Sequence, residues 1–504
     1  MIFFFGLFRN ICHLGNKFFP MHFRLFRIIP ACLFSLSLSG QDLPDSVFSR
    51  LSRQVLSTAD GHARLSRFCR ETGHRLTGSE NGLKAEEQLL ATFRDKGLSR
   101  VEFFPFPIRT WKRNSCELEI VPRNSDHFVP FKAVSLANTP SATGLWNIVD
   151  GGDGLEADLN RISGRIKGNC LLINLDLVRK DSGRQNLHRA EKVSLAIRFG
   201  AAAVLFVHPR EAEMVLTGTA SLDGVPVGIP ALCVSGKDGK EMREWMKKQP
   251  LMADIKVKNE ISEGKARNVM AWVEAPVPAR ETILVCGHLD SWDLGTGAVD
   301  NGIGSFTIPD IAGALQLNKQ LLKRNVLFLL TMGEEQGLLG SRALAAQWLK
   351  EGKLQDIKAV VNLDMVGNPV SINDFDWTNA AGFFDGAEKM IARHMPVFKG
   401  NRSHSPGLHS DHQPFMLEGI PSFSMNSSMP DSVYACYHAD CDNIQLVQQS
   451  WMENSALAHS LLVLDMASRK ELGFFRMKPK KLVKWLKSHR LKEKLEISGE
   501  WKWN

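Results

Sequence analysis

The sequence predicts an α/β protein built on a mostly parallel or mixed sheet flanked by helices, with a smaller α/β unit inserted into it. Between residues 267 and 470, short apolar runs alternate with longer helical patterns, an order typical of parallel sheets. Three of these runs end at Val285, Thr331 and Leu363. A second series of apolar runs, at 123–266, predicts the inserted unit. With 504 residues, 44% of them hydrophobic, the chain is long enough for several domains.

Residues 1–40 have the pattern of a targeting segment outside these domains. A basic stretch at 21–27 precedes a short apolar stretch at 28–38, and small residues follow it, which predicts cleavage near residue 40. Met21 offers an alternative start. Because the apolar stretch is short for a spanning helix, the pattern favours a secreted or periplasmic protein over a membrane anchor or a lipoprotein linked through Cys32.

The main domain is predicted to begin with residues 41–122 and to be interrupted by residues 123–266. In the first part, a turn-rich loop at 72–79 precedes a helix at 81–96, and residues 101–106 have the pattern of an edge strand. The interrupting unit alternates strands and helices of its own, so we expect it to fold around its own core. Its predicted elements are strands at 170–173, 202–207 and 229–234 and a helix at 240–246.

The main domain resumes at residues 267–470, and a basic tail follows it. Residues 302–323 are apolar enough for a buried crossover helix, and Pro309 is expected to confine that helix to its first turns or to kink it. The tail, residues 471–504, alternates apolar side chains with many lysines. It is predicted to form a helix docked on the body or a solvated extension, with contact to a membrane surface as a further alternative.

The positive charge of the chain lies at its two ends. The formal net charge is +8, and residues 1–40 and 471–504 together contribute about +10, which leaves about −2 for the body. This balance gives no support for nucleic-acid binding. The nine cysteines include no CxxC pair, which argues against a zinc site built from cysteines. Cys436 and Cys441 flank a histidine, where either a disulfide or two free thiols fit the pattern.

Polar side chains follow the predicted strands of the 267–470 segment. Strand ends are where open α/β sheets build their sites, and here they carry histidines and carboxylates. Three carboxylates, two neutral imidazoles and a hydroxide balance the charge of two divalent cations, and this nitrogen and oxygen mixture suits zinc, with manganese or cobalt as alternatives. The predicted ligands of two Zn²⁺ ions are His288, Asp300, Glu335, Asp364 and His438.

Two further acids have predicted supporting roles. Asp290 lies two residues after the first histidine ligand and is expected to accept its free imidazole N–H, which would fix the ring orientation. Glu334 and Glu335 are adjacent, and neighbouring side chains in an extended segment point opposite ways. We therefore assign Glu335 to the metal and Glu334 as the general base that takes a proton from the attacking water and passes it to the leaving amine.

These motifs together resemble those of a known family. The sequences GHLDS at 287–291, AVDNG at 298–302, GEEQGLLGS at 333–341 and NLDM at 362–365, with the late His438, are similar to the co-catalytic zinc exopeptidases. That family includes secreted bacterial aminopeptidases and the carboxypeptidase Q branch, which the first motif resembles most. The loop RLTGS and the inserted unit, at GIPAL, resemble the family's N-terminal motif and a protease-associated domain. The resemblance covers roughly residues 45–470.

The resemblance implies an arrangement of the ligands. Asp300 would bridge the two metals, His288 and Asp364 would complete one, and Glu335 and His438 the other. The peptide bond that follows the bridging aspartate would be cis. A hydroxide held between the metals would attack the peptide carbonyl.

Residues that contact the substrate are less well defined by the sequence. A loop at 410–421 also resembles a family loop near the substrate pocket, which makes Asp411 a candidate, with a plain turn carboxylate as the alternative. Tyr434 and Tyr437 are the only tyrosines, and either is a candidate to stabilise the oxyanion. The segment 366–406 does not match the family closely, so the side-chain preference of the pocket stays open.

The predicted function is a secreted dinuclear zinc exopeptidase, similar to carboxypeptidase Q, that hydrolyses dipeptides or short peptides. An aminopeptidase of the same family is the first alternative, since the sequence does not show whether the pocket holds a free amine or a free carboxylate. A glutaminyl cyclase is less favoured because the ligand set is complete for two metals. A catalytically inactive receptor-like binding module would be expected to have lost ligands, and none is lost. The expected partner is a peptide substrate, and a homodimer is left open.

Overall fold

The computed structural model describes residues 43–178, 183–210 and 212–503. The predicted targeting segment, with its cleavage site near residue 40, lies outside the described residues. Among the described residues, no helix has both the length and the apolar character needed to cross a bilayer.

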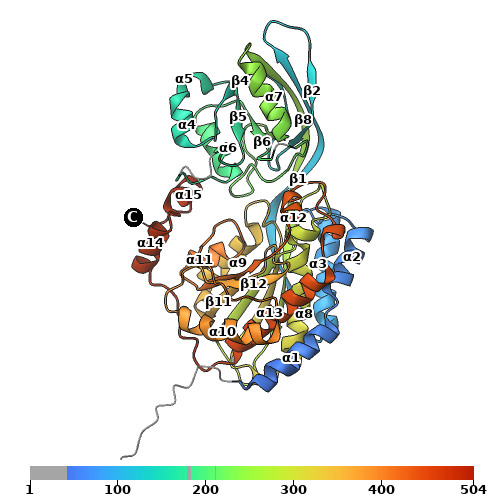
Figure 1. Cartoon of the computed structure of the whole chain (residues 1–504), viewed down its shortest axis with the longest axis vertical. Helices are drawn as coiled ribbons and strands as arrows, with labels where there is room; N and C mark the ends of the chain where they lie inside the picture. Colours follow the sequence, from blue (N-terminus) through green and yellow to red (C-terminus); the bar gives the residue numbers. More distant parts are fainter. Residues whose placement is uncertain (1–42, 179–182, 211, 504) are drawn as a thin grey trace, which may run out of the picture. The chain divides into compact units, whose positions relative to one another are not determined.

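The core of the main domain is a mixed sheet whose central strands are parallel, as predicted (Figure 1). Strand β9 pairs in parallel with β10 and β11, and β11 pairs in parallel with β13. Strands β8 and β12 flank this group in antiparallel orientation. The sheet therefore brings the carboxyl ends of its parallel strands to one edge. The strands are β8 (Leu251–Val273), β9 (Thr282–His288), β10 (Asn325–Thr331), β11 (Ile357–Asn362), β12 (Pro369–Asn373) and β13 (Ser422–Ser427).

Alternate side chains of these strands enter two different cores, because successive residues of a strand point to opposite faces. On β9, Ile283 and Val285 join the core that contains most of the helices, whereas Leu284 and Cys286 face the smaller core of the other side. The larger face is covered by α1 (Asp45–Thr58), α2 (Gly61–Glu71), α3 (Glu80–Asp95), α8 (Ile303–Leu317), α10 (Ala381–His394) and α13 (Gln449–Ser468). The other is covered by α9 (Leu339–Lys350) and α11 (Gln413–Met416).

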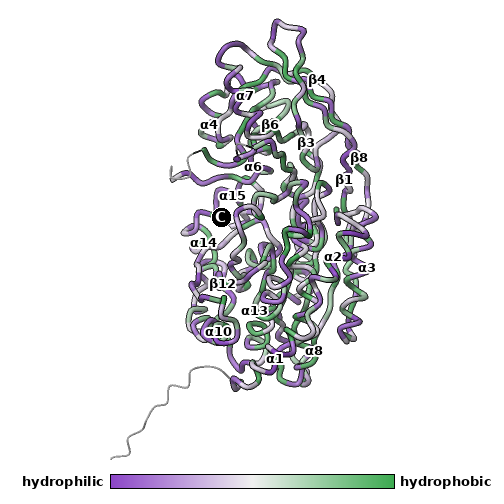
Figure 2. Tube along the Cα trace, turned by 45° about the vertical axis from the view of Figure 1, so that its right-hand side comes forward, coloured by the Kyte–Doolittle hydropathy of each residue, from purple (hydrophilic) through white to green (hydrophobic). Residues whose placement is uncertain are grey.

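Helix α8 differs from the sequence prediction. It continues through Pro309 as one element of 15 residues, and its residues from Ile303 to Leu315 are all buried. Burial on every side explains why the helix survives an internal proline, since the tertiary packing outweighs the lost hydrogen bond. Figure 2 shows apolar residues concentrated in this interior, around α8 and α13.

Two long antiparallel strands lead into the inserted unit and back. Strands β1 (Arg100–Pro122) and β8 each have 23 residues and pair along almost their whole length. The predicted edge strand at 101–106 is therefore only the start of β1, which tolerates Pro105 and Pro107 because β8 is its only partner there. The predicted boundary at 266–267 falls inside β8 rather than between two elements.

The inserted unit has its own core, as expected. Its strands β4, β5, β6 and β7 are parallel, and β3 adds to β7 in antiparallel orientation. The strands between β1 and β8 are β2 (Val129–Phe131), β3 (Ala133–Ser135), β4 (Ala142–Asp150), β5 (Cys170–Asn174), β6 (Ala203–Val207) and β7 (Ala231–Val234). Its helices are α4 (Glu156–Arg161), α5 (Ser163–Ile166), α6 (Arg189–Arg198) and α7 (Gly236–Met246).

The basic tail is docked on the body, which was one of its two predicted forms. It contains α14 (Pro479–Ser488) and α15 (Lys492–Ile497). Leu482, Leu486 and Leu495 are almost fully buried and join the main core. The lysines of α14 lie on the outer side of the helix, so its amphipathic pattern is accounted for by packing on the protein itself.

Candidate metal centre

The predicted ligands converge at the carboxyl edge of the parallel strands. His288 ends β9 and is in register with Thr331, which ends β10 and precedes the loop with Glu335. Asp364 follows β11 directly after Leu363. Because these strands are parallel neighbours, their ends meet in space although their residues are far apart in sequence.

The ligand atoms form two groups that share one carboxylate. His288 Nε2 lies 3.2 Å from Asp300 Oδ1 and 3.5 Å from Asp364 Oδ1. His438 Nε2 lies 3.1 Å from Asp300 Oδ2 and 3.1 Å from Glu335 Oε2. Asp300 thus presents one oxygen to each group, the arrangement that a bridging carboxylate requires. The structure brings all five predicted ligands together.

Asp300, the predicted bridging ligand, is held through its backbone. The carboxylate of Asp442 accepts hydrogen bonds from the backbone N–H of Val299 at 2.7 Å and of Asp300 at 3.0 Å. The peptide bond between Asp300 and Asn301 is cis, as the family resemblance implied. The Asn301 side chain donates to the carbonyl of Leu363 at 2.8 Å, which ties the bridge to the segment that carries the next ligand. The sequence analysis did not identify Asp442.

A buried arginine organises the loop between the first two ligands. Arg75 is fully buried, and its guanidinium donates to the carbonyl oxygens of Leu289, Thr296 and Gly297 at 2.5 to 2.8 Å. It belongs to the RLTGS motif, so that motif acts by fixing the shape of the 289–297 loop.

Asp290 supports the site in a different way from the prediction. The Nδ1 atom of His288 lies 3.1 Å from the backbone carbonyl of Asp290 and 3.7 Å from its carboxylate, so the carbonyl is the better acceptor of the imidazole N–H. The carboxylate instead accepts the backbone N–H groups of Glu334 and Glu335, at 3.2 and 3.3 Å. Asp290 therefore positions both glutamates.

Burial sets the protonation of the acids around the centre. It raises the pKa of Glu334 well above the ordinary value, and neighbouring carboxylates add to this effect. It also raises the pKa of Asp290 to about 7. For Asp300, burial again acts to raise the pKa, but hydrogen bonds from His288 and His438 outweigh it and lower the pKa below its ordinary value.

The donor set fits divalent cations. Several carboxylates are packed together out of contact with water, which is unfavourable without neutralising positive charge. The Oε1 atom of Glu335 is buried and has no hydrogen-bond partner among the described residues. Each group supplies three protein ligands, a number that leaves a coordination position open, and imidazole with carboxylate suits zinc.

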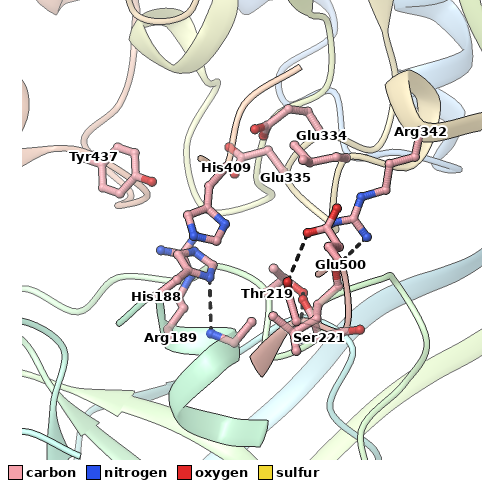
Figure 3. Close-up of a pocket in the computed structure, with 15 residues that line it drawn as sticks. His188, Arg189, Thr219, Ser221, Glu334, Glu335, Arg342, His409, Tyr437 and Glu500 are labelled. Atoms are coloured by element: carbon pink, nitrogen blue, oxygen red, sulfur yellow. Dashed lines mark hydrogen bonds and ion pairs between the residues drawn. The ribbon is translucent and has the colours of Figure 1, made fainter. Parts of the chain in front are cut away.

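A pocket opens beside the centre and is built from three parts of the chain (Figure 3). It has a cavity volume of about 90 Å³ and includes Glu334 and Glu335 from the main domain. The inserted unit contributes His188 and Arg189, and the C-terminal segment contributes Glu500. His188 stacks on His409 with 4.6 Å between the ring centroids. The sequence analysis missed this wall, because His188 has the local pattern of a helix N-cap and in fact caps α6.

The predicted substrate residues occupy different places. Tyr437 lines this pocket and stacks on the ring of His438 at 3.7 Å between centroids. Tyr434 lines a separate cavity, and its hydroxyl donates to the Ser427 carbonyl at 3.3 Å. Asp411 is fully buried, accepts a short hydrogen bond from the Thr331 hydroxyl and does not line the pocket, which argues against its contact with a substrate.

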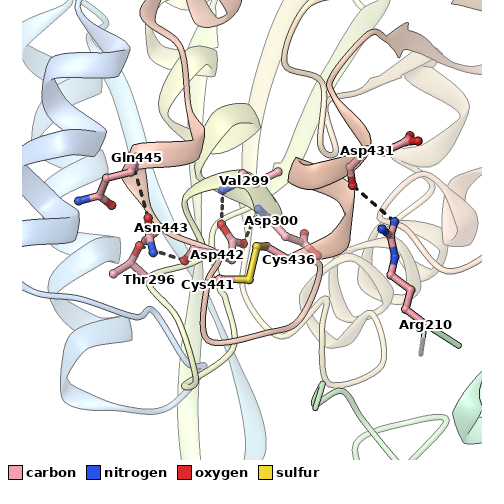
Figure 4. The surroundings of a disulfide bond; sticks show 10 residues. All are labelled: Arg210, Thr296, Val299, Asp300, Asp431, Cys436, Cys441, Asp442, Asn443 and Gln445. Carbon is pink, nitrogen blue, oxygen red and sulfur yellow. Dashed lines mark hydrogen bonds between the residues drawn. A yellow bond between two sulfur atoms is a disulfide. The ribbon is translucent and has the colours of Figure 1, made fainter. Parts of the chain in front are cut away.

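The loop that carries His438 is closed by a disulfide between Cys436 and Cys441, one of the two forms that the sequence left open (Figure 4). Asp442, which holds the bridging aspartate, is the next residue. The disulfide therefore connects the segments before His438 and before Asp442. The short helix α12 (Asp431–Ala435) precedes this loop.

Family comparisons agree with this architecture. Residues 268–463 match the model of Peptidase family M28, and residues 134–242 match the model of the PA domain. Carboxypeptidase Q from Xenopus laevis is 27% identical over 314 residues, which cover 60% of this chain and 63% of that protein. Aminopeptidase YwaD from Bacillus subtilis is 25% identical over 318 residues, covering 60% of this chain and 64% of that protein. The chain thus matches less than two thirds of the length of these relatives.

Solved structures share the fold. The Peptidase M28 precursor from Shewanella amazonensis SB2B superposes with a TM-score of 0.71 at 21% identity, over 86% of this chain and 98% of that chain. An aminopeptidase from Aneurinibacillus sp. strain AM-1 gives a TM-score of 0.64 at 21% identity, over 85% and 98% of the two chains. These comparisons confirm the predicted α/β fold, and the family matches confirm the resemblance to zinc exopeptidases with an inserted protease-associated domain.

Proposed function

Because the chain carries an M28 peptidase region with a PA domain inserted into it, we propose that it is a secreted zinc exopeptidase that hydrolyses dipeptides or other short peptides. The observation that carries this proposal is the position of Asp300, which offers one oxygen to the His288 group and the other to the His438 group. Two ions, one in each group, account for all five ligands. The disulfide at Cys436 supports an oxidising compartment, in keeping with secretion.

The side chains near the ligands suit peptide hydrolysis. When bound, a pair of zinc ions would polarise the scissile carbonyl and make water more acidic. Glu334 lines the pocket and is oriented by Asp290 through its backbone N–H. Its raised pKa means that it can take a proton and hold it until the leaving amine accepts it. The hydroxyl of Tyr437, on the pocket wall, is the better placed of the two tyrosines to donate to the oxyanion.

The pocket also contains a buried cation that favours a substrate with a free carboxylate. Arg189 is about nine-tenths buried, its Nε atom has no hydrogen-bond partner among the described residues, and no carboxylate there forms an ion pair with it. Its terminal nitrogen lies 3.0 Å from His438 Nδ1, and the Thr217 carbonyl lies 3.3 Å from the same atom.

Metal binding would change the partner of Arg189. If His438 binds metal through Nε2, the proton of the neutral ring is on Nδ1, where it can be donated to the Thr217 carbonyl. Arg189 then has no acceptor on that ring. A buried guanidinium without a partner is costly, and a substrate carboxylate would supply the missing anion. A site for a free carboxylate at Arg189 favours a carboxypeptidase or dipeptidase over an aminopeptidase.

The test compares zinc-loaded protein on a dipeptide, the same dipeptide as its amide, and its N-acetyl form. We expect the free dipeptide to be hydrolysed best, and we expect Arg189→Met to remove the preference for carboxylate over amide, a change of about 10- to 100-fold in the ratio of kcat/KM. Arg198→Met is the matched control, since Arg198 lies on the same helix but is exposed.

Each other outcome has a defined meaning. The aminopeptidase alternative would be favoured if the dipeptide and its amide are hydrolysed equally well and the N-acetyl dipeptide is not hydrolysed. If Arg189→Met lowers kcat/KM for the dipeptide and for its amide by the same factor, Arg189 only positions His438. Absence of any zinc-dependent hydrolysis would reject the enzyme and favour a receptor-like binding module.

A further inference from the structure

The C-terminal segment, residues 471–503, reaches the pocket although it lies outside both family matches. Its first helix, α14, is fixed on the main domain by Trp485, which packs edge-on against Trp377 at 5.6 Å between centroids. The Trp485 indole N–H also donates to the Asp376 carbonyl at 3.2 Å. The second helix, α15, contacts α6 of the inserted unit, and Ile497 packs against the core of that unit. The segment thus connects the main domain with the inserted unit beside the pocket.

The residues after α15 place a carboxylate in the pocket wall. The turn is closed by backbone hydrogen bonds from Glu500 and Trp501 to the Leu495 carbonyl, at 2.8 and 2.9 Å. Glu500 Oε2 then lies 3.1 Å from the guanidinium of Arg342 and accepts a hydrogen bond from Gln413 at 2.8 Å.

These contacts fix Glu500 to the two helices on the smaller-core face of the sheet. Arg342 belongs to α9, and Gln413 begins α11. Ser498 donates to the same Glu500 oxygen at 3.2 Å, so three donors hold one carboxylate oxygen. A side chain held in this way forms a fixed wall, because moving it would break a charge-assisted bond and two further hydrogen bonds.

The pocket is therefore bounded at two distinct places by charged side chains, the Arg189 guanidinium and the Arg342–Glu500 ion pair. Figure 3 shows Arg189 on one side and the Arg342–Glu500 pair on the other, with Glu334 and Glu335 between them in that view. Its cavity volume is about 90 Å³, which is small beside the range of about 300–1,000 Å³ that small-molecule sites occupy. Each further residue of an extended peptide adds about 3.4 Å of length, which a pocket of this small volume cannot accommodate freely.

We propose that the C-terminal segment is a wall of the substrate pocket, and that Glu500, held by Arg342, restricts the site to dipeptides. The inference rests on the proposed peptidase function. With the substrate carboxylate at Arg189, the N-terminal residue points away from it, and any residue added before it meets the Arg342–Glu500 pair. The tail converts a site that would otherwise accept longer peptides into a dipeptidase site.

The experiment compares a dipeptide with the tripeptide made by adding one alanine at its N-terminus, using the zinc-loaded full chain. We expect the wild type to prefer the dipeptide, and we expect Glu500→Ala to raise the ratio of tripeptide to dipeptide kcat/KM by about 10-fold or more, the effect of relieving one steric conflict in a pocket. A second variant, Glu500→Gln, keeps the size of the side chain, so its ratio should stay near that of the wild type.

Glu496→Ala is the matched control, because Glu496 is exposed on α15, forms an ion pair with Lys492 at 3.1 Å and does not line the pocket. It should leave both rates unchanged. The role of the tail would be overturned if wild type and Glu500→Ala both hydrolyse the dipeptide, have equal thermal stability and show the same ratio of tripeptide to dipeptide kcat/KM. The peptidase function would then remain intact. Failure of the wild type to hydrolyse either peptide would instead reject the proposed function.

Discussion

Asp442 provides a test of how the predicted metal centre is held together, because it contacts the backbone at Asp300, the predicted bridging ligand, and not the predicted ligand oxygens. Its carboxylate accepts from the N–H groups of Val299 and Asp300, one on each oxygen. Asp442→Asn keeps the shape of the side chain but replaces one accepting oxygen with an NH₂ group. One of the two N–H groups would then face another donor.

The expected loss follows from these contacts. A hydrogen bond to a charged acceptor contributes about 1.5–3 kcal/mol, and one of the two is lost. Since 1.4 kcal/mol corresponds to a tenfold change, Asp442→Asn should weaken zinc binding by about 10- to 100-fold, the range found for residues that support metal ligands from behind. Burial raises the pKa of Asp442 to about 7, so the effect should be largest above that pH, where the wild-type side chain is charged.

Zinc affinity would be measured by competition with a chromophoric chelator at pH 8, together with the number of zinc ions bound per chain. Asp440→Asn is the matched control, because Asp440 lies two residues earlier in the same loop and is exposed. The reasoning is refuted if Asp442→Asn binds zinc as tightly as Asp440→Asn while both keep the thermal stability of the wild type.

Two further predictions concern the base and the buried core. Glu334→Gln should bind the same amount of zinc but lose about 10²- to 10⁴-fold in kcat, measured with a dipeptide, and near-normal turnover would remove Glu334 as the base. His459, in α13, is fully buried and its pKa is lowered to about 4 by burial, although its ring contacts the Ser455 carbonyl at 2.7 Å. The unfolded chain has the higher histidine pKa of about 6.5, so it binds the proton first as the pH falls, and His459 should cost the folded state up to about 3 kcal/mol between pH 6.5 and 4. Urea unfolding in EDTA should therefore show a weaker loss of stability on acidification for His459→Gln than for the wild type, and parallel curves would contradict this.

Three of the five predicted ligands obey one local rule with a consequence for the whole fold. His288, Glu335 and Asp364 each follow an apolar run, and parallel strands bring such positions to one edge. His438 follows no strand in the structure; it was predicted as the second imidazole of the charge-balanced ligand set, and the family resemblance implies the same residue. Of the two predicted effects of Pro309, confinement of the helix to its first turns was wrong, because the packing of the buried helix α8 outweighs the lost hydrogen bond.

The pocket wall could not be predicted, because its residues have ordinary local explanations. His188 is a helix cap, Arg189 is the first residue of a helix, and Glu500 lies in a charged tail. No periodicity or spacing marks them, since they meet only when three separate segments are folded. Asp442 was missed for the same reason, because its partners are backbone N–H groups that no side-chain pattern reveals.

Two long paired strands join the inserted unit to the main domain and give its residues a fixed position in the pocket. A flexible linker would leave Arg189 without a fixed position, but β1 and β8 pair as one long ribbon from the main sheet into the insertion. The Thr217 carbonyl also contacts the ring of His438, so the insertion touches a predicted ligand directly. Shifting the insertion would therefore disturb the His438 group, because Thr217 and Arg189 of the insertion contact the ring of His438. The two halves of the centre are thus supported unequally: the His288 group by the rigid sheet, and the His438 group by a disulfide-closed loop and the inserted unit.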